Sequence, residues 1–438
     1  MVIAGFGEVT AAAPGAGESS LLPPVRRLVM DNGLRVLAQS DCSLPLIAVH
    51  ASYAGGSRND PPGREGLAHL AEHLALRGPE GRWTEAVEAA GGVVQGTTLH
   101  DQVTFSTLLP SRHLDVALEL EALRLQQAAD LSPRTVAAQQ RVLVEELCQR
   151  ADDGHDAPIL ESLHRCLYPP GHPYHAPPAG SPAGVLSTTA AELRAHVEDS
   201  YVPRRTTIAV VGDFDTDECL EVLAARLARL PNPPTGGPEP SRELPPPSAG
   251  ASATVRGHRS PPSVWIGIPV PGIGEPGWFA AQLIAHHLAV GRGSLLHRRL
   301  VEARPLARRV TAGMAHMRDG STLCLEATAA GGVALEELEE VLAGALDEWA
   351  ESEPPSPQDL RPARAKAAND HYRRMQELPR RAAFLALHDR AEGVEPDVDL
   401  LPRGLAAIAP AALQRFAHAR CRRACGVLLR IAPHGGPA

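Results

Sequence analysis

A proline- and glycine-rich stretch near the middle of the chain constrains the fold more than any other feature. Residues 231–250 read PNPPTGGPEPSRELPPPSAG, a composition that can form neither a helix nor a central strand. The chain has 438 residues, which is too long for one ordinary hydrophobic core. We therefore expect two domains of similar length, at 21–230 and 251–438, joined by a linker at 231–250.

Both halves mix strand-like and helix-like segments in a similar order. In the first half, apolar extended segments at 33–37 and 46–49 precede a helical pattern at 66–76. In the second half, a strand pattern at 263–268 precedes a helical pattern at 278–290. This mixture of strands and helices in both halves predicts an α+β protein built from two related domains.

The composition limits the kinds of partner and the cellular location that we expect for the protein. The formal net charge is −9, and the lack of a dense lysine and arginine run argues against a nucleic-acid partner. Seven widely spaced cysteines indicate free thiols in a reducing compartment. Residues 1–20 lack the features of a signal peptide and are interpreted as a flexible arm, and no segment reaches the roughly 20 apolar residues of a membrane span. We expect a cytoplasmic protein with no membrane partner.

The segment HLAEH contains two histidines, His69 and His73, four residues apart. Leucines recur around them at helical spacing. Because residues i and i+4 share a helix face, the two imidazoles can bind one ion, and Zn²⁺ favours such nitrogen ligands. Glu72 lies near the same face but is rotated from it, so it can reach a water at the ion without ligating the metal. That is the position of a general base.

A third protein ligand is expected on another helix. The helical pattern at 133–150 contains Glu145 and Glu146. Glu146 shares a face with Val142 and Leu143, whereas Glu145 is turned about 100° away, toward solvent. A carboxylate on an apolar face is costly unless it is paired or bound to a metal, which favours Glu146 as the ligand.

The residues alone leave other interpretations open. The five-residue segment is also compatible with two surface histidines and a helical carboxylate. Glu146 is also compatible with a carboxylate at the rim of the core.

Several segments resemble, in their order along the chain, the inverzincin family of zinc peptidases, which includes pitrilysin, insulin-degrading enzyme and the mitochondrial processing peptidases. The segments are 32–36 (first strand), 66–73 (metal-binding helix), 142–147 (helix with a distal glutamate) and 201–214 (end of the first domain). The resemblance covers most of the chain. It implies two homologous domains, each a mostly antiparallel sheet packed with helices. It also implies one Zn²⁺ per chain, held by His69, His73 and Glu146.

Two departures from the family lie near the metal and the substrate. The family has a second glutamate seven residues before the distal ligand, where this chain has Gln139. An amide can still hydrogen-bond a ligand but adds no negative charge. The resemblance also places the substrate backbone along an edge strand at Gln95, Gly96 and Thr97, where Gln95 replaces the family's asparagine.

A larger departure lies in the second half. The family carries there an arginine and, seven residues later, a tyrosine that bind the substrate carbonyl. The matching residues here are Val301 and Arg308. A valine donates no hydrogen bond, and a guanidinium has a different shape from a phenol. Some bacterial members divide these roles between two subunits, so the resemblance implies that this chain is the metal-bearing member of a heterodimer.

The function that follows is that of a zinc-dependent endopeptidase subunit, which hydrolyses peptides or processes a precursor peptide. Glu72 would activate the water, and a homologous partner would supply the arginine and tyrosine. Two alternatives remain open: a non-catalytic assembly subunit of the same family, and a factor that binds a precursor peptide for another enzyme.

Overall fold

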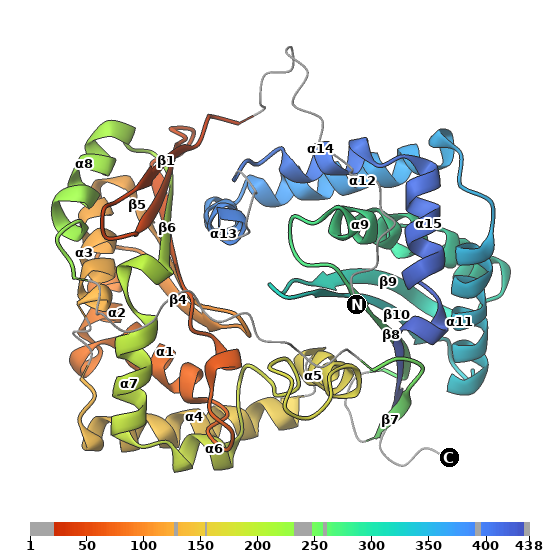
Figure 1. Cartoon of the computed structure of the whole chain (residues 1–438), viewed down its shortest axis with the longest axis horizontal. Helices are drawn as coiled ribbons and strands as arrows, with labels where there is room; N and C mark the ends of the chain where they lie inside the picture. The colour runs from red at the N-terminus through yellow and green to blue at the C-terminus, as the bar shows by residue number, and fades with distance from the viewer. Residues whose placement is uncertain are drawn as a thin grey trace. The chain divides into compact units, whose positions relative to one another are not determined.

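The fold comes from a computed structural model, which describes residues 22–126, 130–153, 156–231, 248–256, 261–389 and 396–432. The predicted arm at 1–20 and most of the predicted linker at 231–250 lie outside these ranges. The described chain forms two compact units (Figure 1). The first unit holds residues 23–231 together with those described from 374 to 398. The second unit holds the described residues from 248 to 373 and from 399 to 432.

The first unit is built on a six-stranded sheet in the order β1-β2-β6-β3-β5-β4. All neighbours are antiparallel except β2 and β6, which are parallel. The strands are β1 (Arg26–Val29), β2 (Arg35–Ser40), β3 (Leu46–Tyr53), β4 (Val93–Thr98), β5 (Val103–Pro110) and β6 (Thr206–Gly212).

Helices cover both faces of this sheet (Figure 1). One face of β3, with Ile47, Val49, Ala51 and Tyr53, forms a common core with the leucines of α1. The helices of the unit are α1 (Leu67–Arg77), α2 (Arg82–Ala89), α3 (Leu114–Leu125), α4 (Pro133–Asp153), α5 (Asp156–Leu167), α6 (Pro182–Ser187), α7 (Ala190–Ser200), α8 (Thr216–Leu227) and α13 (Leu378–Asp389).

Helix α13 comes from the second half of the chain but packs on β3 and β6 of the first unit. The side chain of Asp389, at its end, is fully buried, accepts a hydrogen bond from Arg27 Nε at 2.6 Å and forms an ion pair with Arg35 Nε at 3.0 Å. Arg381 donates to Asp41 across 2.8 Å. The second half of the chain is therefore not one unbroken structural unit, because residues from 374 to 398 complete the first unit.

The second unit repeats the topology of the first. Its five-stranded sheet has the order β7-β11-β8-β10-β9. Its neighbours are antiparallel except β7 and β11, so it matches β2-β6-β3-β5-β4 strand for strand in chain order. The strands are β7 (Ser252–Arg256), β8 (Ser263–Val270), β9 (Ala307–Ala315), β10 (Ser321–Ala329) and β11 (Val427–Ala432).

Helices pack on the second sheet around a separate hydrophobic core. They are α9 (Pro276–Ala289), α10 (Leu295–His297), a π-helical turn (Arg298–Ala303), α11 (Leu335–Glu351), α12 (Pro357–Met375), α14 (Leu400–Ala407) and α15 (Pro410–Arg420). The prediction of an α+β protein with two related, mostly antiparallel domains is confirmed. None of the helices in the described part of the chain combines the length and hydrophobicity that a membrane crossing needs.

Candidate metal centre

Helix α1 carries three of the predicted site residues and is fixed firmly at its start. It begins after Gly66, whose φ of 107° is in the left-handed region that favours glycine. The carboxylate of Asp60 accepts from the backbone N–H of Gly66 at 2.8 Å and of Ala68 at 2.9 Å, which satisfies amides that a helix start leaves unpaired. His69 and Glu72 are only 4% and 5% exposed. The helix therefore presents these polar groups inside the unit.

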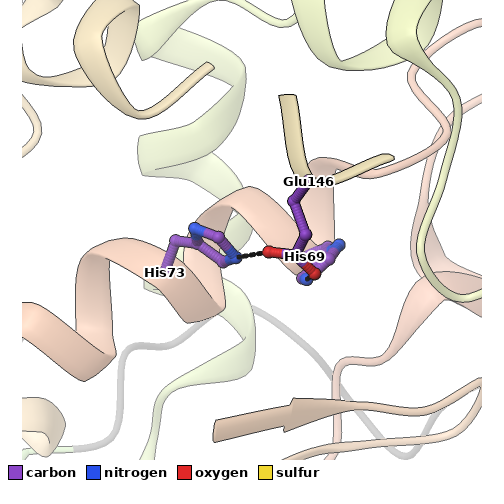
Figure 2. A group of neighbouring side chains, drawn as sticks. All are labelled: His69, His73 and Glu146. Atoms are coloured by element: carbon purple, nitrogen blue, oxygen red, sulfur yellow. Dashed lines mark ion pairs between the residues drawn. The ribbon is translucent and has the colours of Figure 1, made fainter. Parts of the chain in front are cut away.

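Helix α4 brings Glu146 against the two histidines (Figure 2). Glu146 Oε2 lies 3.3 Å from His73 Nε2, and Glu146 Oε1 lies 3.9 Å from His69 Nε2. The three ligand atoms all lie within 4.8 Å of one another. Zinc with bonds of about 2.0–2.1 Å in tetrahedral geometry places its ligand atoms roughly 3.3 Å apart. Two imidazoles and one carboxylate at these separations fit a catalytic zinc site with one position open to solvent or substrate.

The histidines are prepared for metal binding by their surroundings. His69 Nδ1 lies 3.0 Å from the carbonyl oxygen of Ala179, so Nδ1 carries the proton and Nε2 keeps its lone pair. Burial lowers the pKa of His69 to about 4. Burial also lowers the pKa of His73. Both rings are therefore neutral near pH 7, which is the form that ligates a metal.

Glu72 is held by the edge strand β4 and not by its own helix. Thr98 Oγ1 donates to Glu72 Oε2 at 3.0 Å, and Glu72 Oε2 lies 3.9 Å from His69 Nε2. Burial raises the pKa of Glu72 to about 7, an effect that the Thr98 hydrogen bond opposes. A carboxyl group that titrates near neutral pH beside the ligands is suited to accept and return a proton.

Comparison with known proteins identifies the family of the chain. A model described as insulinase (peptidase family M16) matches residues 35–172, and one described as the peptidase M16 inactive domain matches residues 187–366. The chain belongs to peptidase family M16. It is 25% identical to zinc protease PqqE of Helicobacter pylori over 348 residues, which cover 76% of each chain.

One further relative in sequence and one solved structure are similar to the M16 chain. It is 23% identical over 215 residues to a mitochondrial-processing peptidase subunit beta of Blastocladiella emersonii, covering 48% of this chain and 45% of that protein. The crystal structure of a protease from Helicobacter pylori shares the fold with a TM-score of 0.83 and 21% identity, covering 94% of this chain and 100% of that one.

The other residues predicted near the metal of this M16 chain lie on α4. Glu145 is exposed, as expected. Gln139 is half-buried, and its Oε1 accepts no hydrogen bond, so its role behind the ligands stays a prediction. The expectation that Val142 shares a buried face with Glu146 is wrong, because Val142 is 47% exposed while Leu143 is buried. Glu146 therefore lies at the margin of the apolar stripe of α4 and not at its centre.

The predicted substrate-binding residues lie on strand β4. Among the described strands, β4 pairs only with β5, and it forms one edge of the first sheet. Gln95 and Thr97 are exposed, and Gly96 contacts Glu72. An edge strand can pair with an extended peptide through its backbone, so the prediction of substrate binding at Gln95, Gly96 and Thr97 stands as a prediction.

Val301 and Arg308 belong to the second unit. Val301 lies in the π-helical turn and packs, half-buried, against the core of that unit. Arg308 is exposed near the start of β9. Their match to the arginine and tyrosine of the family, and the loss of that pair in this chain, stay predictions.

Sequence reasoning missed three groups that contact the site. They are Thr98 on β4, the carbonyl of Ala179 before α6, and Arg150, whose Nη2 lies 2.7 Å from Glu146 Oε1. Arg150 follows Glu146 by four residues, and that spacing could have revealed it. The other two come from segments far away in the sequence and have no local signal.

Proposed function

We propose that this M16 chain is the metal-bearing subunit of a zinc-dependent endopeptidase, active with a homologous partner. The observation that carries the proposal is the convergence of His69, His73 and Glu146 within 4.8 Å, with Glu72 beside them. Family membership and relatives named zinc proteases support the same activity. The substrate would be a peptide or the precursor of a processed peptide.

His69, His73 and Glu146 would hold the Zn²⁺. The ion, when bound, would polarise the peptide carbonyl and make a water molecule more acidic. Glu72 would take the proton from that water at the carboxylate held by Thr98, and would then give it to the leaving amine. Burial supports this role because it keeps the pKa of Glu72 near 7, so that the group can move a proton in both directions.

A partner is proposed because one part of the expected machinery is missing. Val301 and Arg308 stand where the family has an arginine and a tyrosine. Hydrogen-bond donors to a developing oxyanion typically contribute about 3 kcal/mol each to lowering the barrier. A homologous chain that retains the pair would supply these donors. A relative named as one subunit of a processing peptidase supports such pairing.

The test is to measure zinc content and cleavage of a fluorogenic peptide for the chain alone and mixed with a homologous subunit that retains the pair. The wild type is expected to bind one zinc and to cleave only in the mixture. Glu72→Gln should keep the zinc and lower the rate by about a thousandfold, whereas His69→Ala should lose the zinc. Full activity of the isolated chain would reject the need for a partner, and equal rates for E72Q and wild type would reject Glu72 as the base.

One observation also favours a second candidate, a non-catalytic subunit that binds peptides or supports assembly. The model that matches residues 187–366 describes an inactive domain, and the arginine and tyrosine pair is replaced in this part of the chain. Stoichiometric zinc and peptide affinity without cleavage, even beside the partner, would favour this candidate.

We also propose a cytoplasmic location. All seven cysteines are free thiols, and two of them, Cys42 and Cys148, are exposed, which suits a reducing compartment. Fractionation of cells that express the tagged chain would test the location.

A further inference from the structure

Arg150 binds the carboxylate that is proposed to ligate the metal. It lies one turn after Glu146 on α4, and its Nη2 is 2.7 Å from Glu146 Oε1. The same Oε1 is the Glu146 atom nearest His69, at 3.9 Å. The Arg150 side chain is 52% exposed, so its guanidinium also meets water. A cation thus occupies a position that a metal ion must share or take over.

The positive charge of Arg150 lies against a ligand carboxylate whose oxygens face both histidines. A positive charge in this position disfavours the approach of another cation. The effect doubles for a divalent ion, because the interaction energy scales with the charge.

We propose that Arg150 is a displaceable countercation of the metal site, bound to Glu146 before a metal ion binds and displaced from it when Glu146 ligates a divalent cation. The inference rests on the proposed function, because it takes His69, His73 and Glu146 as the ligands. Arg150 then lowers the affinity of the site, since each metal ion has to displace a cation that neutralises one of its ligands.

The sign of the effect separates this role from that of a group that orients the ligand. Removing an orienting hydrogen-bond partner behind a metal ligand weakens binding, typically about 10–100-fold. Removing a competing cation strengthens binding instead.

The experiment measures the dissociation constant for Zn²⁺ by competition with a chromogenic chelator, using the full chain. Arg150→Gln should bind zinc about tenfold more tightly than wild type, and Arg150→Lys, which keeps the charge, should stay near wild type. Arg141→Gln, an exposed change of the same charge on the same helix, is the control and should leave the affinity unchanged.

Unchanged or weaker zinc binding by R150Q would overturn the countercation role. Retention of the zinc by His69→Ala would defeat the ligand set, and with it the proposed function as well as this inference. The unfolding midpoint of each variant, measured in parallel, identifies any change in affinity that comes from damaged folding.

Discussion

At the scale of single residues, the position of Glu72, the proposed general base, requires a residue without a side chain opposite it. Gly96 on β4 lies so close to Glu72 that an added Cβ would be 2.1 Å from Glu72 Oε1. Thr98, two residues along the same strand, donates to Glu72 Oε2 at 3.0 Å. The strand thus leaves space for the carboxylate and also binds it. Glu72 therefore stays beside His69, and His69 remains the neighbour of Glu146.

Gly96→Ala should therefore displace Glu72. The methyl group meets the end of a flexible side chain, so the carboxylate rotates away from Thr98 while the fold remains. We expect one zinc per chain as in wild type, a little-changed KM, and a kcat about a hundredfold lower, because misplacing a catalytic group by about 1 Å has costs of that order. Peptide hydrolysis by the complete enzyme and elemental analysis measure both quantities.

The control for this variant is Gly313→Ala on β9, the counterpart of β4 in the second sheet. A Cβ added at Gly313 meets no atom within 4 Å, so its kcat should match wild type. A G96A enzyme as active as G313A would show that Glu72 tolerates the methyl group and that its contact with β4 is not needed.

The sequence predicted the residues on one helix face better than the contacts between helices. Spacing alone indicated that His69 and His73 share a face, because helix geometry fixes the i and i+4 relation. Periodicity also favoured Glu146 over Glu145, and the structure brings Glu146 to the histidines. The carbonyl of Ala179 could not be predicted, because every residue carries a carbonyl and only tertiary packing selects one.

At the scale of elements, the boundaries of two helices followed from local pattern to within two residues. The helix predicted at 66–76 is α1, Leu67–Arg77, and the one predicted at 278–290 is α9, Pro276–Ala289. The return of residues from 374 to 398 to the first unit did not follow, because no change of composition marks it. An ion-pair cluster around Asp389, which no local pattern marks, joins α13 to β1 and β2.

Asp389→Ala should destabilise the first unit by about 2–4 kcal/mol. The substitution removes the buried acceptor of Arg27 and Arg35, and breaking such a pair leaves charges without a partner. Both arginines are partly exposed and can be rehydrated, so we expect less than the full cost of a wholly buried pair. Urea unfolding, followed by circular dichroism, measures the change.

Asp217→Ala provides the matched control for this variant. Asp217 pairs with Arg26 at 3.6 Å, and both side chains are largely exposed, so its loss should cost less than about 1 kcal/mol. Equal stability of D389A and D217A would mean that the Asp389 cluster does not hold α13 on the sheet.

At the scale of the whole molecule, two units of equal topology have diverged in chemistry. Both sheets order their strands in the same way, with a single parallel pair in each. Among the described residues, the one group of side chains that can hold a metal lies in the first unit. The repeated topology thus supplies the scaffold, and a few residues on α1 and α4 of one copy supply the metal ligands.

The first unit also buries histidines that are not proposed to bind metal, and these should make the molecule sensitive to acid. Burial lowers the pKa of His50 to about 4 and that of His164 to about 3. In the unfolded chain a histidine takes up a proton near pH 6.5. Between pH 6.5 and 4, the unfolded state therefore binds more protons than the folded state. The contribution of these histidines to the free energy of unfolding is fully present above this window and is lost as the pH falls through it.

The histidine contribution can be isolated by comparing variants over one pH interval. Between pH 7.5 and 5.5, protonation of one such histidine in the unfolded state lowers the free energy of unfolding by about 1.4 kcal/mol. Over this interval the His50→Gln variant should therefore lose about 1.4 kcal/mol less stability than wild type. The metal ligands are the same in both proteins, so their contribution to the loss is the same in both. Exchange of exposed His418 for glutamine should leave the loss unchanged. If urea unfolding gave wild type and H50Q the same loss, burial would not keep His50 neutral in the folded protein.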